Sequence, residues 1–202
     1  MEDTFTQLPL RLDPTSKAIT TSSTSDIALT EELQALNTLH RSLLSLETPV
    51  PPPPMPGNPK RTAQITKLRE SGNTNFRKGA YVDAARMYTF GLEMALGRPP
   101  WEPAVMLRDE LSGLYANRAQ AYMAMQSWAE GMVDAEASVE LKRVGNAKGW
   151  WRKGRCLMEM GRIEEAHEWV GRGLEFEGKD GDLLGLMKEL EGLLSRREAK
   201  RN

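Results

Sequence analysis

Three segments of the chain repeat one pattern of two helices, and this repetition constrains the fold more than any other feature. The segments are KLRESGNTNFRKGAYVDAARMYTFGLEMA at 67–95, LYANRAQAYMAMQSWAEGMVDAEASVELK at 114–142 and GWWRKGRCLMEMGRIEEAHEWVGRGLEFE at 149–177. Each predicts a helix of about 14 residues, a short turn and a second helix. Small residues recur where the helices would cross, and larger side chains there would push the helices apart. The pattern therefore predicts an array of stacked helix pairs.

The spacing of the segments resembles that of the tetratricopeptide repeat, whose period is about 34 residues. The second and third segments begin 35 residues apart, but the first and second begin 47 apart. The excess indicates an insertion within 97–110, which lengthens either the first inter-repeat loop or the helix after it. The resemblance implies repeats at about 65–98, 112–145 and 147–180. A final helix at 182–198, with Asp182 as its N-cap, is expected to cover the last repeat.

The first region, residues 1–47, predicts a small hairpin and one helix. Alternating Leu8, Leu10 and Leu12 indicate a strand, and KAIT at 17–20 indicates its return. Thr30 is the expected N-cap of the helix. Its apolar stripe consists of Leu29, Leu33, Leu36, Leu43 and Leu46, flanked by Leu39 and Leu44. A lone hairpin and helix do not make a stable domain, so we expect this region to dock on the rest of the chain or on another protein.

Residues 48–61, TPVPPPPMPGNPKR, are rich in proline and predict an extended, semi-rigid linker. The same composition also suits a ligand of SH3 or WW domains. The repeat region then occupies 62–202. The predicted fold class is mainly α: a three-repeat superhelix with a C-terminal capping helix, preceded by a small β-hairpin and a helix.

Composition and motif spacing argue against several classes of function. The formal net charge of −1 is not the basic footprint of a nucleic-acid-binding protein. The lone cysteine, Cys156, allows no intramolecular disulfide and is expected to be a small buried side chain. GLEFEGKD at 173–180 has the spacing of a phosphate-binding loop, but Asp180 stands where Ser or Thr should hold magnesium. His40 and His167 lack metal-ligand spacing, so we expect neither enzyme activity nor a cofactor.

The stretch GNAKGWWRKG at 145–154 places Lys148 and Arg152 four residues apart on one face of a helix. Like charges at this spacing destabilise a helix by a few tenths of a kcal/mol. In a tetratricopeptide superhelix the first helix of each repeat lines the concave groove. Trp150 and Gly154 take the core positions, which directs both cations into that groove. Their mutual repulsion therefore favours binding of an anion.

Five groove positions resemble the dicarboxylate clamp of co-chaperone tetratricopeptide domains. The matching stretches RESGN (69–73), YANRAQAY (115–122) and KGWWR (148–152) supply Arg69, Asn73, Asn117, Lys148 and Arg152. Arg69 stands where lysine is commoner. The resemblance implies that the groove binds the C-terminal EEVD tail of heat-shock chaperones through its two terminal carboxylates. Trp151 either covers an apolar residue of the bound tail or packs against the neighbouring repeat.

The short N-terminal region with its DPTSK turn, the linker and three repeats together resemble the fungal cytosolic subunit of the post-translational translocation complex at the endoplasmic reticulum. That implies a peripheral protein on the cytosolic face of the membrane, held by a membrane-anchored partner subunit that docks on 1–47. Its groove would capture 70-kDa-class heat-shock chaperones that deliver precursor proteins. We expect no membrane span and no secretory signal. Two alternatives stay open: a soluble co-chaperone adaptor with the same clamp, and a scaffold that binds an internal peptide of a fixed partner.

Overall fold

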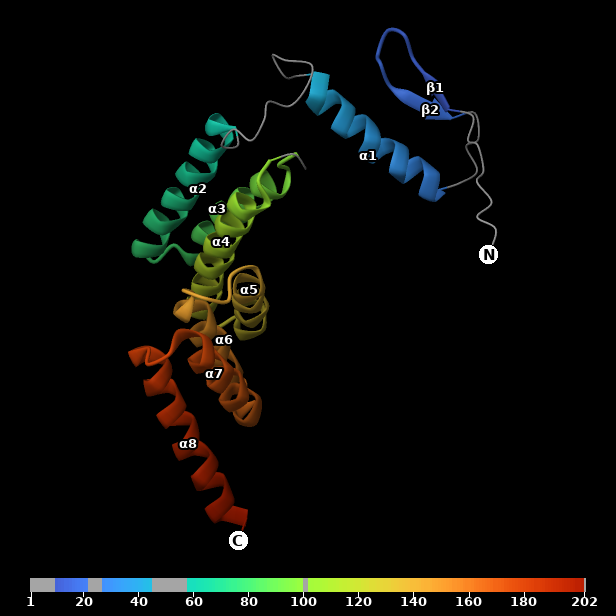
Figure 1. The fold of residues 1–202 in the computed structure, drawn as a ribbon. Coiled ribbons are helices and arrows are strands. Elements are labelled where there is room, and N and C mark those ends of the chain that lie inside the picture. The colour runs from blue at the N-terminus through green and yellow to red at the C-terminus, as the bar shows by residue number, and fades with distance from the viewer. Residues whose placement is uncertain (1–9, 22–26, 45–57, 100–101, 202) are drawn as a thin grey trace, which may run out of the picture. The chain divides into compact units, whose positions relative to one another are not determined.

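The fold is given by a computed structural model, which describes residues 10–21, 27–44, 58–99 and 102–201. The chain divides into two compact units, Met1–Met55 and Pro56–Asn202. Each unit has its own internal contacts. The predicted fold class, a mainly α array of helix pairs after a small hairpin and helix, is confirmed (Figure 1).

The N-terminal unit holds a short hairpin against one helix. Strands β1 (Leu10–Leu12) and β2 (Ile19–Thr21) pair antiparallel, with Leu10 opposite Thr21. The helix α1 spans Ile27–Leu44 and contacts β2. Its Asn37 side chain accepts the backbone N–H of Ile19 at 2.6 Å and donates to the backbone carbonyl of Ile19 at 2.8 Å. One amide thus satisfies both backbone groups of Ile19, which joins the helix to the hairpin.

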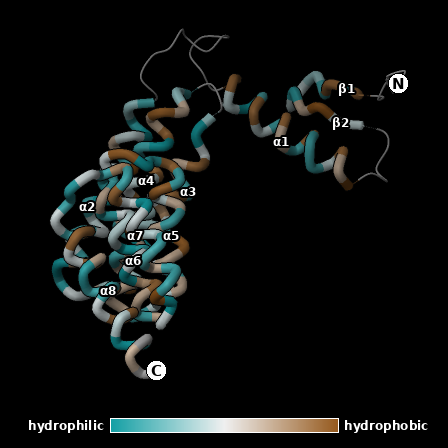
Figure 2. Tube along the Cα trace, turned by 60° about the horizontal axis from the view of Figure 1, so that its bottom comes forward, coloured by the Kyte–Doolittle hydropathy of each residue, from teal (hydrophilic) through white to brown (hydrophobic). Residues whose placement is uncertain are grey.

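One prediction for this unit is wrong, and another concerns residues that the structure does not describe. Helix α1 begins at Ile27, so Thr30 lies inside the first turn and is not the N-cap. Leu8 and Leu46 lie outside the described residues. Hydrophobic residues recur along α1 (Figure 2), but Leu33 is the only residue of the helix that is buried. A large share of the apolar surface in the described part of this unit therefore remains exposed.

The C-terminal unit consists of three helix pairs and a last helix. Their bounds are α2 Pro59–Arg77, α3 Tyr81–Leu96, α4 Ala104–Ala124, α5 Trp128–Leu141, α6 Ala147–Glu159, α7 Ile163–Glu177 and α8 Gly181–Arg201. The turns inside the pairs are equivalent: Gly79, Gln126 and Gly161 all have positive φ. A non-glycine residue in that region is uncommon, so Gln126 adopts a conformation that the repeat imposes.

The first helices of the pairs form one continuous layer. Helix α4 contacts α2 on one side and α6 on the other, and α6 also contacts α8. The second helices α3, α5 and α7 do not contact one another within the described ranges. Helices lie closer together on the inside of a curved array, so α2, α4 and α6 line its concave side.

Close helix packing at glycine holds the third pair together. A Cβ atom placed on Gly154 of α6 would lie 2.5 Å from Cγ2 of Val170 and 3.1 Å from Cδ2 of Leu186. The same arrangement recurs at Gly173, where an added Cβ would lie 3.1 Å from the Trp150 side chain. At Gly154 only the hydrogen of glycine leaves room for Val170, whereas at Gly173 an added methyl group would need a small shift of the Trp150 side chain.

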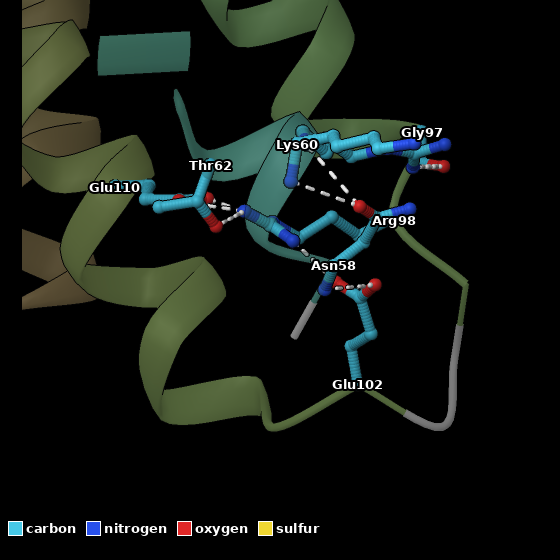
Figure 3. A network of polar contacts seen from close by, with 8 residues as sticks. Asn58, Lys60, Thr62, Gly97, Arg98, Glu102 and Glu110 are labelled. Atoms are coloured by element: carbon cyan, nitrogen blue, oxygen red, sulfur yellow. Dashed lines mark hydrogen bonds and ion pairs between the residues drawn. The ribbon is translucent and has the colours of Figure 1, made fainter. Parts of the chain in front are cut away.

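The insertion within 97–110 mainly lengthens the helix after it, because α4 already begins at Ala104. A buried arginine fixes the short loop that remains (Figure 3). Arg98 donates to both carboxylate oxygens of Glu110, at 2.7 and 2.8 Å, and to the Thr62 hydroxyl at 2.8 Å. It also pairs with Glu102, which accepts the Asn58 backbone N–H. The insertion is thereby tied to the start of α2 and to α4.

The last helix starts differently from the prediction. Helix α8 begins at Gly181, and the side chain that caps it belongs to Asp180 rather than Asp182. Asp180 Oδ1 accepts the backbone N–H groups of Asp182 and Leu183 at 3.1 and 3.0 Å. Leu183, Leu186 and Leu190 are buried against the third pair, so α8 covers the end of the array.

We expect Gly154→Ala to lower the free energy of unfolding by about 1–3 kcal/mol, because the added methyl group overlaps Val170. Gly113→Ala in α4 is the matched control, since nothing lies within 4 Å of its added Cβ. Removing a mid-helix glycine there should raise stability by up to about 1 kcal/mol. Urea denaturation followed by circular dichroism measures both changes, and equal effects of the two variants would contradict the packing argument.

Candidate peptide-binding groove

The five residues of the predicted clamp lie on the first helices of the three pairs. Helix α2 carries Arg69 and Asn73, α4 carries Asn117, and α6 carries Lys148 and Arg152. These three helices form the continuous inner layer of the array. The geometry of the repeats therefore places all five residues on helices of one surface.

Asn73 and Asn117 are in direct contact across the first two repeats. The Oδ1 atom of Asn73 accepts a hydrogen bond from the Tyr88 hydroxyl at 2.8 Å and one from Asn117 Nδ2 at 3.2 Å. Burial raises the pKa of Tyr88, and the positive charges of Arg152 and Arg77 oppose that shift. With both acceptor positions of Oδ1 used, the polar group that Asn73 can still offer is its donor Nδ2.

Arg152 is a part-buried cation whose hydrogen-bond partner is a neutral amide. Its Nε donates to Oε1 of Gln120 at 2.8 Å. No carboxylate in the described part of the chain forms a salt bridge with it. Burial lowers the pKa of Arg152 to about 10, and the nearby Tyr88 opposes the shift. Below that pH the folded protein holds a desolvated positive charge, which a bound anion would stabilise.

A cavity of about 700 Å³ opens beside Arg152. It is lined by Lys148, Trp151, Arg152, Gln120 and Asn146. Three acidic residues also line it: Glu177 at the end of α7, Asp180 before α8 and Asp182 in the first turn of α8. Lys148 is exposed, whereas Trp151 is half-buried. Trp151 also packs against the core of the third pair. Its contact with a bound tail stays a prediction.

Among the five predicted clamp residues, Arg69 has the fewest contacts with the other four in the described structure. It is half-buried one turn before Asn73 on α2. Within the described ranges it forms no hydrogen bond or salt bridge, and it does not line the cavity. In the structure, Asn73 and Asn117 share a hydrogen bond. Lys148 and Arg152 line the same cavity. Arg69 lies on the same face of α2 as Asn73.

Sequence reasoning missed two residues that orient the groove. Gln120 occupies the position in the second repeat that Asn73 has in the first, and this equivalence could have identified it. Tyr88 is the aromatic position of the repeat, but its hydroxyl contact with Asn73 depends on helix α3 facing α2, which no local pattern reveals.

The cysteine of this unit lies in its core. Cys156 is fully buried, as predicted, and burial raises the pKa of its thiol to about 12. At neutral pH it is therefore protonated and a poor nucleophile. In the described ranges, no helix has both the length and the apolar character that a membrane span requires. The groove offers binding groups for an anion: amides, a guanidinium and an ammonium.

The helix pairs and the inner layer define a tetratricopeptide-repeat protein. The first such domain of Spaghetti (RPAP3), solved with the HSP90 peptide SRMEEVD bound, matches with a TM-score of 0.53 at 26% identity. That match covers 66% of this chain and 94% of the domain. A chain of the Sec complex from S. cerevisiae has the same fold, with a TM-score of 0.70 at 24% identity over 93% of this chain and 98% of that one.

No protein-family model matches the chain. The ER protein translocation subcomplex subunit sec67 of Schizosaccharomyces pombe is 34% identical to it over 143 residues, which are 69% of this chain and 74% of that protein. The chain belongs to the family of this translocation subunit.

We expect Arg152→Met to raise the free energy of unfolding at pH 7 by about 1 kcal/mol, because an apolar side chain of similar length replaces a desolvated charge. Arg108→Met, at an exposed position of α4, is the control and should change stability by less than about 0.5 kcal/mol. Urea denaturation measures both. A loss of stability in Arg152→Met larger than about 1 kcal/mol would show that the charge is already satisfied within the protein.

Proposed function

We propose that the protein is a non-enzymatic adaptor of the endoplasmic-reticulum translocation complex. Its groove binds the C-terminal EEVD-type tail of cytosolic 70-kDa-class heat-shock chaperones and so recruits precursor proteins for post-translational translocation. The observation that carries this proposal is Arg152, a part-buried cation without a carboxylate partner among the described residues, on the inner surface of the repeats. Membership of the sec67 family and the likeness to a domain solved with an SRMEEVD peptide support it.

The hydrogen-bonding groups that remain open in the groove suit a chain terminus. Arg152 has used only Nε, so the donors of its two terminal nitrogens remain. Asn73 retains Nδ2, and Lys148 adds an exposed ammonium group. A C-terminal aspartate carries two adjacent carboxylates, and each charge-assisted hydrogen bond contributes about 1.5–3 kcal/mol. Binding entropy and desolvation offset much of this gain, so we expect micromolar affinity.

The N-terminal unit supplies the second half of the proposed adaptor. Leu10, Leu12, Leu36 and Leu44 are all more than two-fifths exposed. Docking on a membrane-anchored partner subunit would bury them and hold the protein on the cytosolic face of the membrane. The adaptor then raises the local concentration of chaperone-bound precursor next to the translocation channel. A soluble co-chaperone would instead remain in the supernatant when microsomes are sedimented.

We expect a peptide that ends in EEVD to bind at micromolar affinity and the same peptide with an amidated C-terminus to bind at least tenfold more weakly. Lys148→Ala and Arg152→Ala should each weaken binding of the free-acid peptide at least tenfold, because each removes a charged donor. Lys188→Ala, at an exposed position of α8, is the control and should bind as the wild type does. Calorimetry measures affinity, and circular dichroism checks that helicity is unchanged.

If the amidated peptide binds as tightly as the free acid, the groove recognises an internal peptide and the clamp assignment is wrong. If the peptide binds as described but the protein does not sediment with microsomes, the soluble co-chaperone is the better assignment. The two measurements therefore separate the proposal from both alternatives.

We expect Tyr88→Phe to weaken the binding of the EEVD peptide about three- to tenfold. The variant keeps the aromatic ring but removes the donor that fixes Oδ1 of Asn73, a bond of about 1 kcal/mol. Tyr81→Phe is the matched control, since Tyr81 makes only a ring contact with Phe76 in the described structure. Calorimetry at constant helicity is the measurement, and equal affinities for the two variants would show that Asn73 needs no support.

A further inference from the structure

Gln120 shares the cavity of the groove with the two clamp cations of α6. It follows Asn117 by three residues on α4, which places both side chains on the same face of that helix. Helix α4 is the middle helix of the inner layer, since it contacts both α2 and α6. Gln120 is half-buried and lines the cavity of about 700 Å³ together with Lys148 and Arg152. A side chain outside the predicted clamp therefore belongs to the same surface.

The amide of Gln120 holds the guanidinium of Arg152 by one nitrogen only. Arg152 Nε donates to Gln120 Oε1 at 2.8 Å. Because a guanidinium is planar, a hydrogen bond at Nε restricts the rotation of the whole group and sets the direction of its two terminal nitrogens. These nitrogens carry four of the five donors of an arginine side chain, and for Arg152 neither has a partner among the described residues. Gln120 thus orients the part of Arg152 that a ligand can use.

Arg118 shows what a carboxylate does in the same kind of contact. Its Nε and Nη2 donate to the two oxygens of Asp134 at 2.7 and 2.8 Å. Its Nη1 donates to the Thr89 hydroxyl at 2.9 Å, so every nitrogen of this guanidinium has a partner. Gln120 accepts only from Nε, because an amide has a single acceptor oxygen and no charge. Arg152 therefore keeps both its terminal donors and its positive charge.

The remaining hydrogen-bonding group of Gln120 also favours an anion. Since Arg152 Nε can only donate, the amide atom that faces it is the oxygen, and the amide nitrogen Nε2 is turned away from it. The described structure records no partner for this Nε2. The acceptor of Gln120 is thus used inside the protein, and what it has left is a donor. A carboxylate can accept from that donor, whereas a cation cannot.

We propose that Gln120 is a positioning residue of the groove, which orients Arg152 for the terminal carboxylates of a bound tail without neutralising its charge. Glutamate has the same length as glutamine, but it would satisfy the charge of Arg152 inside the protein. Methionine would leave the charge in place and would not orient it. This inference rests on the proposed function, because it assumes that the terminal carboxylates lie at Arg152.

Substitutions of Gln120 that keep its length test the proposal by calorimetry with a peptide that ends in EEVD. We expect Gln120→Glu to weaken binding at least about tenfold, because the carboxylate takes the place of the ligand at Arg152. Gln120→Met should weaken binding about three- to tenfold without adding a charge, because Arg152 Nε loses its acceptor. Gln64→Glu, at an exposed position of α2, controls for net charge and should bind as the wild type does. Circular dichroism checks that the variants fold.

Urea denaturation separates this role from a merely structural one. We expect Gln120→Glu to raise the denaturation midpoint by about 0.3–1 M, because the new carboxylate pairs with Arg152. Binding and stability then move in opposite directions, which the loss of a structural contact would not produce. In an Arg152→Met background, Gln120→Glu should no longer raise the midpoint, and this double-mutant cycle assigns the gain to the pair.

This inference alone is overturned if Gln120→Glu or Gln120→Met binds the peptide as tightly as the wild type. It is also overturned if Gln120→Glu does not raise the midpoint, because its effect on binding is then plain repulsion of the peptide. Failure of the proposed function gives a different result. In that case the wild type itself does not bind the peptide, or it binds the amidated peptide equally well, and the inference fails with it.

Discussion

The packing of Tyr88 over Gly72 connects the fold of this protein to its binding surface. A Cβ atom on Gly72 would overlap the Tyr88 ring, so the glycine lets α3 lie directly on α2. The hydroxyl of the same tyrosine donates to Asn73, the next residue along α2. Asn73 in turn accepts from Asn117 of α4, which carries the contact into the second repeat. A side chain that helps to build the core therefore also orients the first two groove residues.

Three arginines of the repeat unit, Arg98, Arg118 and Arg152, differ in whether a carboxylate of the protein neutralises their charge. Arg118 donates to both oxygens of Asp134 at 2.7 and 2.8 Å, and Arg98 is paired with two glutamates. Both charges are neutralised inside the protein. Arg152 is part-buried next to the neutral Gln120, so its charge is solvated only in part. A protein selected for stability alone would pair or replace such a charge. Its retention is consistent with a surface that a ligand completes.

The helix pairs could be predicted because small residues recur at equivalent positions of the three segments, and this register also indicates which residues face inward. Asn73, Asn117, Lys148 and Arg152 follow from that register. The failures concern interactions that no local pattern encodes. Thr30 and Asp182 both have the chemistry of an N-cap, but the helix starts in each case one or more residues earlier than that chemistry suggested. The contacts of Gln120 and Asn37 join segments far apart in the sequence, so only the folded chain reveals them.

The two units differ in the size of their buried cores, and this difference suits an adaptor. The repeat unit has a buried cluster in its first and in its last helix pair, with α8 covering the end. Among the described residues of the N-terminal unit only Leu33 is buried, and the hairpin is held to α1 largely through the amide of Asn37. In the proposed adaptor, docking would supply order that so small a core cannot. The repeat unit needs no such help, because its own buried clusters hold the helices of the groove in place. The proposed adaptor thus pairs a constitutive attachment, coupled to the ordering of one unit, with a preformed and reversible site on the other.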